Sequence, residues 1–159
     1  MERTMMDASD AVYGSLAECY ITIEGRRYNF MSITEFESYW KAKIVDVPIL
    51  GKVGMGHKPA GGSGTWKGKV HYNQSYFRRI ADTYQKTGSI PYFEIQVSNE
   101  DPTTSIGRQT IIHRGCLCED FPLAKLLAGE ELLDEELSGT FESWDMPEKF
   151  KELDGFHTN

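Results

Sequence analysis

The sequence predicts a mainly β protein with one α-helix, and three patterns support this fold class. Apolar and polar residues alternate over 28–47, 65–72 and 93–97, which is the period of a half-buried strand. The stretch 75–87, with apolar residues at helical spacing, is the only convincing helix. Glycines and prolines between these stretches supply turns and breaks.

The size and composition of the chain indicate a single globular domain. It has 159 residues, of which 40% are hydrophobic and 26% charged, so wholesale disorder is not expected. We predict a flexible segment over 1–13, one domain over 14–150 and a tail over 151–159. No apolar run approaches the ~18 residues of a membrane span. The first residues lack the apolar core of a signal peptide, which favours an intracellular origin.

The first half of the chain is predicted to form hairpins around a long strand. Residues 16–23 form a strand, and Glu24-Gly25 turns the chain. The stretch 28–47 reads as a long strand with an apolar face (Phe36, Trp40, Ala42, Ile44) and a charged face (Glu35, Glu37, Lys41, Lys43). Because ordinary strands have ~5–6 residues, we expect a bend or bulge in it. The glycine-rich residues 48–64 are predicted as a long loop.

The remaining elements follow from the same patterns. Trp66, Val70 and Tyr72 share one face of a strand over 65–72. The helix over 75–87 ends at Gly88, and Pro91 prevents its continuation. Strands over 93–98 and 108–119 form a hairpin. For 122–129 we predict a short helix or turn, and for 132–144 a strand; a helix over 124–142 is the alternative, because its leucines and glutamates favour helix.

The net charge of −7 lies in the last quarter of the chain. Residues 119–159 contain 12 acidic and 3 basic residues, a net of −9, whereas residues 1–118 contain 12 acidic and 14 basic, a net of +2. A protein that coats nucleic acid is expected to be basic, so this class is disfavoured. The acidic part is either a solvated surface or a surface that repels anions.

No catalytic or metal-binding pattern emerges from the sequence. Cys116 and Cys118 lie too far apart along a strand for a comfortable disulfide and lack a second pair of ligands, so ordinary buried cysteines are expected. Glu35 and Glu37 are close enough for a glycosidase pair but are better explained as a solvated face. We therefore predict no enzyme activity and no cofactor. Two alternatives stay open: a small barrel that binds single-stranded nucleic acid, and a metal or redox protein using the two cysteines.

Several motifs, in their order and spacing, resemble the tail tube proteins of contractile bacteriophage tails, of the type found in the PBSX defective prophage and in contractile bacteriocins. They include Ile49-Leu50-Gly51-Lys52, Gly56-His57-Lys58, the stretch 61–65, the stretch 84–88, Pro91-Tyr92-Phe93, Ile106-Gly107-Arg108 and the ending 139–150. The resemblance covers about residues 14–150. The stretch 119–123 departs from the family pattern, and the family tends to have Phe-Thr-Phe-Glu-Asp where this chain has Gly139-Thr140-Phe141-Glu142-Ser143.

The resemblance implies a rolled β-barrel or sandwich with long hairpins and one flanking helix, similar to the tube of type VI secretion. Six copies would form a ring with a continuous β-barrel lumen, and rings would stack into a tube. Implied partners are further copies of the chain, the tail sheath, the tape measure, the baseplate tube-initiating and tail-terminator proteins, and double-stranded DNA in the lumen of a phage. The implied location is a virion tail or bacteriocin particle, assembled in the bacterial cytoplasm.

Candidate residues follow from combining the patterns with the resemblance. Inter-subunit contacts are assigned to Gly51, Lys52, Gly56, His57, Lys58, Gly61, Gly62, Gly64 and Trp66. Packing of the helix is assigned to Phe77, Ile80, Ala81 and Tyr84. Charges facing the lumen are assigned to Glu35, Glu37, Lys41, Lys43 and Glu94.

Overall fold

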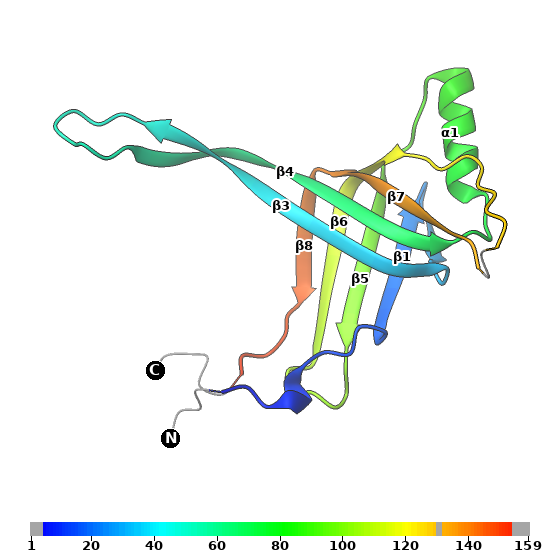
Figure 1. Ribbon diagram of the computed structural model, residues 1–159, viewed down its shortest axis with the longest axis horizontal. Coiled ribbons are helices and arrows are strands. Elements are labelled where there is room, and N and C mark those ends of the chain that lie inside the picture. Colours follow the sequence, from blue (N-terminus) through cyan, green and yellow to red (C-terminus); the bar gives the residue numbers. More distant parts are fainter. Residues whose placement is uncertain (1–4, 130–131, 154–159) are drawn as a thin grey trace. The chain divides into compact units, whose positions relative to one another are not determined.

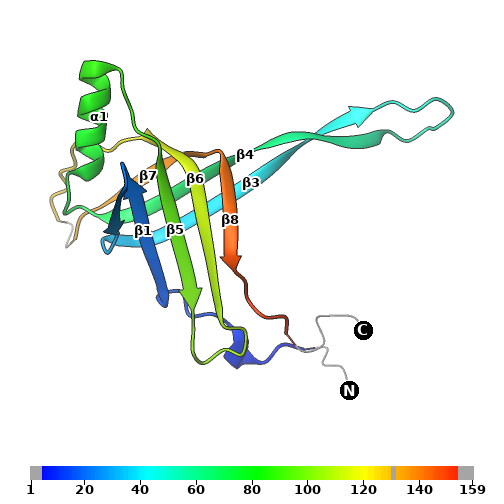
Figure 2. The ribbon, with the colours of Figure 1, turned by 180° about the vertical axis from the view of Figure 1, so that it is seen from behind.

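The computed structural model describes residues 5–129 and 132–153. Over these residues the chain forms eight strands, one α-helix and a short 3-10 helix, η1 (Ala8–Asp10), which confirms the mainly β class (Figures 1 and 2). The chain divides into two compact units. Unit 1 contains the described parts of 1–31, 91–114 and 144–159, and unit 2 contains the described parts of 32–90 and 115–143.

Unit 1 is a β-sheet in the order β2-β1-β5-β6, with β8 also paired to β6. Its strands are β1 (Ala17–Ile23), β2 (Arg26–Asn29), β5 (Phe93–Glu100), the first half of β6 (Arg108–Asp120) and nearly all of β8 (Ser143–Glu148). The predicted turn at Glu24-Gly25 is confirmed: both residues have positive φ, 51° and 79°, as a two-residue hairpin turn requires.

The core of unit 1 comes from the alternating strands. Ile21 and Ile23 on β1 are buried, as are Phe93 and Ile95 on β5. The buried polar side chains are paired: His113 Nδ1 donates to the Ile95 carbonyl at 2.9 Å, and Ser98 and Thr110 share a hydrogen bond. Burial lowers the pKa of His113, so its ring is neutral near pH 7.

Part of the N-terminal segment that was predicted to be flexible is tied to unit 1. Ser105 donates from its backbone N–H and its hydroxyl to the buried carboxylate of Asp10. The Tyr13 N–H donates to Asp101, which is also buried and whose pKa is lowered mainly by the Thr103 hydroxyl. These carboxylates anchor η1 and the residues after it to the turn that follows β5.

Unit 2 is a second antiparallel sheet, in the order β6-β7-β4-β3. It contains β3 (Ile33–Val47), β4 (Gly56–His71), α1 (Tyr76–Thr87), β7 (Asp134–Phe141) and the second half of β6. The expected long strand over 28–47 is therefore split, because residues 30–32 separate β2 from β3. The expected bulges are present, at Ile33/Glu35 and at Ala42/Ile44. In the described residues the strands form open sheets rather than a closed barrel.

The prediction of a loop over 48–64 is wrong for its second half. β4 begins at Gly56, and only residues 48–55 connect it to β3. Pairing with β3 overrides the low strand propensity of these glycines, since Gly56, His57 and Lys58 stand opposite Val47, Asp46 and Val45. Gly61 has a φ of +93° beside the bulge, a conformation that other residues adopt only with strain.

The core of unit 2 depends on one close approach of backbone to backbone. Trp66, Val70, Leu137 and Phe141 are buried, and Trp66 donates from Nε1 to the Leu117 carbonyl. A Cβ on Gly139 would lie 1.9 Å from that same carbonyl oxygen. Glycine at 139 therefore allows β7 to approach β6 over the indole of Trp66.

The predicted helix is confirmed as α1, and the predicted strand over 132–144 is confirmed as β7 and the start of β8. Gly88 ends α1 in the left-handed conformation, with its N–H bonded to the Tyr84 carbonyl. The alternative of a helix over 124–142 is wrong. Residues 122–127 carry no regular structure, and only a turn is present at Ala128–Gly129. No helix of the described residues has the length and apolar character to cross a lipid bilayer.

Candidate assembly surfaces

The hairpin of β3 and β4 extends beyond the rest of the unit 2 sheet. β4 pairs with β7 from Gly64 to His71, whereas it pairs with β3 from Gly56 onward. Among the described residues, the remaining part is therefore a two-stranded projection, which we call the arm (residues 41–62), and Figures 1 and 2 show it reaching away from the other strands of unit 2. A two-stranded ribbon is marginally stable in water by itself.

The end of the arm is apolar and exposed to solvent. Ile49, Leu50, Val53 and Met55, which we call the arm tip, have exposed fractions of 42%, 103%, 109% and 53%. Ile49 lies against Gly56 of β4, whereas Leu50 and Val53 are fully exposed. Such patches mark surfaces that bind another macromolecule.

Most of the predicted contact residues lie on the arm, but two of them do not. The loop holds Gly51 and Lys52, and β4 holds Gly56, His57, Lys58, Gly61 and Gly62. His57 contacts Asp46 of β3 at 3.0 Å, with both side chains exposed. The assignment of Gly64 and Trp66 stays a prediction, and both are buried in unit 2: a Cβ on Gly64 would meet the Phe141 ring at 2.4 Å, and Trp66 is 4% exposed.

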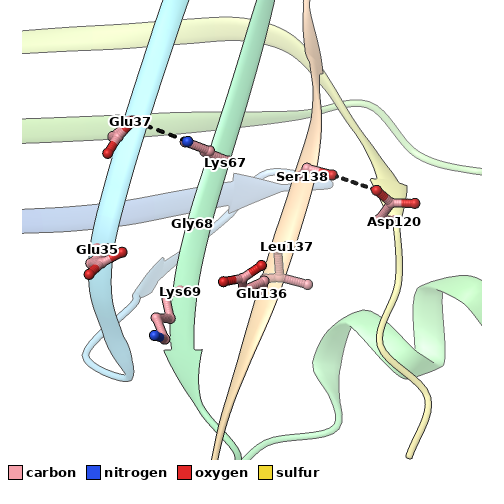
Figure 3. A pocket seen from close by; sticks show the side chains of 9 residues that line it. All are labelled: Glu35, Glu37, Lys67, Gly68, Lys69, Asp120, Glu136, Leu137 and Ser138. Atoms are coloured by element: carbon pink, nitrogen blue, oxygen red, sulfur yellow. Dashed lines mark hydrogen bonds and ion pairs between the residues drawn. The ribbon is translucent and has the colours of Figure 1, made fainter.

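The exposed face of the unit 2 sheet carries rows of alternating charge. Glu35 stands opposite Lys69, which stands opposite Glu136. In the next row Glu37 stands opposite Lys67, at 3.5 Å between Nζ and Oε2. Figure 3 shows these side chains around a shallow cavity of about 370 Å³, with Ser138 donating to Asp120 at its edge.

The electrostatics of this face do not favour catalysis. The Tyr39 hydroxyl donates to Glu37, and together with the Lys67 ammonium it lowers the pKa of that carboxyl. A glycosidase acid needs a raised pKa, so Glu37 is a poor proton donor at neutral pH. The rows instead form a hydrophilic surface on which side chains of opposite charge lie side by side on neighbouring strands.

The other predicted lumen charges are distributed over two units. Lys41 and Lys43 are exposed on β3, in line with the prediction that this face is charged. Glu94 lies on β5 in unit 1, where it pairs with Arg114 at 2.8 Å. Arg114 also holds Asp145 of β8, and these two carboxylates raise the pKa of its guanidinium.

The helix α1 is attached to unit 2 by the buried side chain of Phe77 and by the guanidinium of Arg78. Of the four residues predicted to pack, Phe77 is buried, Ile80 and Ala81 are half-buried, and Tyr84 is 51% exposed. Sequence reasoning missed Arg78. Its guanidinium pairs with the buried carboxylate of Glu135, donates to the carbonyls of Gln74 and Leu123, and lies over the Tyr72 ring.

The cysteines offer neither a metal site nor a reactive thiol. Cys19, Cys116 and Cys118 are free and buried, and burial raises the pKa values of Cys19 and Cys118 to about 12. Within residues 5–129 and 132–153, no group of three or more histidine, cysteine, aspartate or glutamate side chains is arranged to hold a metal ion.

The fold is that of proteins in contractile injection machines. The chain resembles a chain in the baseplate structure of the anti-feeding prophage, with a TM-score of 0.62 and 12% identity over 82% of this chain and 91% of that chain. It also resembles a chain in the sheath-tube complex of an extracellular contractile injection system, with a TM-score of 0.57 and 10% identity over 80% and 86%.

The family is established by sequence. Residues 4–148 match the family model described as phage tail tube protein. Two relatives from Bacillus subtilis (strain 168) are the phage-like element PBSX protein XkdM, 31% identical over 76% of this chain and 82% of its own length, and the uncharacterized protein YqbM, 32% identical over 75% and 81%. This chain therefore belongs to the phage tail tube protein family. Members of this family are components of phage tails.

Proposed function

We propose that the chain is the structural, non-enzymatic subunit of the inner tube of a contractile particle, either a phage tail or a phage-tail-like bacteriocin. Six copies form a ring with a continuous β-barrel lumen, and rings stack into a tube through which DNA or ions pass. The observation that carries this proposal is the arm, a marginally stable projection with an exposed apolar tip. Membership in the tail tube family and the fold shared with contractile machines support it.

The open sheets support assembly into rings. In the described residues β3 and β2 lie at the ends of the strand order, each with one edge unpaired. Exposed strand edges tend to pair with other chains, and closing strands into a ring removes them. The strands of a single copy do not close into a barrel. Pairing of these edges between copies would close the rolled barrel.

We assign the subunit contacts to Gly51, Lys52, Gly56, His57, Lys58, Gly61 and Gly62 on the arm, and the lumen to the charged face with Glu35, Glu37, Lys41 and Lys43, together with Glu94. α1 lies outside the barrel.

A ring of six copies carries −42, six times −7. Any part of this acidity that faces the lumen repels DNA, so that DNA passes without adhering. Partners in this assignment are the sheath, the tape measure, and the baseplate and terminator proteins, with assembly in the host cytoplasm.

The proposal is tested by negative-stain microscopy and sedimentation of the purified chain at rising concentration. We expect hollow rings or tubes above a threshold concentration. A double variant, Leu50→Asp with Val53→Asp, keeps the fold but loses assembly, because charges replace the arm tip. Wild-type chains that stay monomeric at every concentration, also when the sheath protein is added, would contradict the proposal.

A further inference from the structure

A second exposed apolar surface lies in unit 2, between β6 and β7. Leu123, Leu126, Leu127 and Leu132 have exposed fractions of 70%, 92%, 47% and 74%. We call the described residues 121–129 and Leu132 the leucine linker. This stretch contains the short helix or turn predicted from the sequence, and its start departs from the family pattern, so the tail tube resemblance leaves it without a role.

The backbone of the leucine linker is held at Leu123 and Lys125, although its leucines are exposed. Arg78 of α1 donates from Nε to the Leu123 carbonyl at 2.9 Å, and the Lys125 N–H donates to the Tyr72 hydroxyl. Lys125 Nζ also donates to the Asp134 carbonyl at 2.7 Å. A held backbone that presents leucines to water is a preformed docking surface, because little ordering is required when a partner covers it.

The charges of the leucine linker and the arm are opposite. The arm, residues 41–62, contains four lysines and one aspartate, a net of +3. The described residues of 119–136, on both sides of the leucine linker, contain five acidic residues and one lysine, a net of −4, with Glu135 buried against Arg78. Charges of opposite sign around two apolar patches direct one patch onto the other and disfavour pairing of like patches.

The arm tip does not reach the leucine linker of its own chain. The linker precedes Asp134, which pairs with His71 at the far end of β4. The arm tip precedes Gly56, at the other end of β4. These ends are 15 residues apart along an extended strand, which is about 50 Å at ~3.3 Å per residue. An arm tip that covers the linker must therefore come from a second copy.

We propose that the arm tip of one copy docks on the leucine linker of the next copy. The two surfaces differ, so the contact is head-to-tail, and each copy gives its arm to one neighbour and receives the arm of another. Such a contact closes into a ring or continues along a stack. The inference rests on the proposed tube function and assigns the surface that receives the arm, as well as a role for the acidic stretch.

The test uses a double variant of the full chain, Val53→Cys with Leu126→Cys, treated after assembly with a short bismaleimide cross-linker. The native cysteines are buried and do not compete for the reagent. We expect a ladder of dimers, trimers and higher multiples on a denaturing gel, because each copy is linked to two neighbours. The single variants, Val53→Cys and Leu126→Cys, give no ladder, since neither carries both partners.

The matched control pairs Val53→Cys with Gln85→Cys on the exposed surface of α1. Assembled tubes in which the test variant gives no ladder, or in which the control gives an equal one, would overturn the docking while leaving the tube function intact. Wild-type chains that never assemble would reject both proposals.

A variant without cysteines checks the same contact. Leu126→Asp places a charge where the arm tip docks, and we expect the threshold concentration for assembly to rise by about tenfold or more. Gln85→Asp is the control and leaves the threshold unchanged. Normal assembly of the Leu126→Asp variant would overturn the docking even if the double-cysteine variant did not assemble.

Discussion

At the scale of single residues, unit 2 depends on positions that accept no additional atoms. Gly139 illustrates this, because its backbone passes directly over the Leu117 carbonyl and the Trp66 indole nitrogen. The sequence shows a glycine at this position, but only the register between β6 and β7 shows why. Trp66 is the reverse case: its alternation on 65–72 predicts its burial correctly, and Phe36 stacks on it with the ring centroids 6.2 Å apart.

Gly139→Ala is therefore expected to destabilise the chain by about 1–3 kcal/mol or more, because the backbone must move to admit a Cβ. Urea unfolding of the two proteins measures the difference. Gly54→Ala is the control, since nothing lies within 4 Å of a Cβ at that position. Equal midpoints for Gly139→Ala and the wild type would contradict the packing described for unit 2.

The buried thiols are expected to be unreactive in the folded chain. At pH 8 the native protein should react very slowly with a disulfide reagent, and all three cysteines should react once urea unfolds it. The Val53→Cys variant should add one fast-reacting thiol.

The raised pKa values of Cys19 and Cys118 favour the folded state below pH 9.0, and this contribution is lost between pH 9.0 and about 12.

At the scale of elements, the sequence correctly predicts the helices and strands that depend on local patterning. It fails for strands that depend on pairing with another strand. The helix over 76–87 and the strand starting at Phe93 follow from periodicity. The first half of β4 is rich in glycine and contains Pro59, so its strand character depends on β3 alongside it. Residues 122–129 have helical leucine spacing, but so short a helix needs packing against other elements, and Arg78 holds the linker by its backbone instead.

Arg78→Ala is expected to cost about 3–5 kcal/mol, because it leaves the carboxylate of Glu135, 2% exposed, buried without its partner. Thermal unfolding with the helical signal as readout measures the loss. Lys86→Ala, which removes the exposed pair with Asp82 on the same helix, should cost no more than about 0.5 kcal/mol. Similar losses in both variants would show that Arg78 is not the attachment point of α1.

At the scale of the whole molecule, exposed apolar groups and separated charges favour the proposed assembly of several copies of the chain. The arm tip and the leucine linker are both exposed in one chain, and their surroundings carry opposite charge. The total of −7 alone argues against binding nucleic acid, and its distribution assigns the basic and acidic surfaces to two sides of one contact.

Assembly should consequently depend on salt. Raising the ionic strength screens the attraction between the basic arm and the acidic linker region, so we expect slower association and a higher threshold concentration. Light scattering after dilution into buffers of increasing salt measures both quantities. Lys52→Glu with Lys58→Glu should weaken assembly at low salt and lessen its salt dependence. Identical salt curves for this variant and the wild type would argue against electrostatic steering by the arm.

The most direct test of the central claim is a cryo-electron microscopy map of the assembled wild-type chain. We expect stacked rings of six copies around a hollow lumen, with each arm tip lying on the leucine linker of another copy. A chain that remains monomeric, or rings in which the arm projects into solvent, would contradict it.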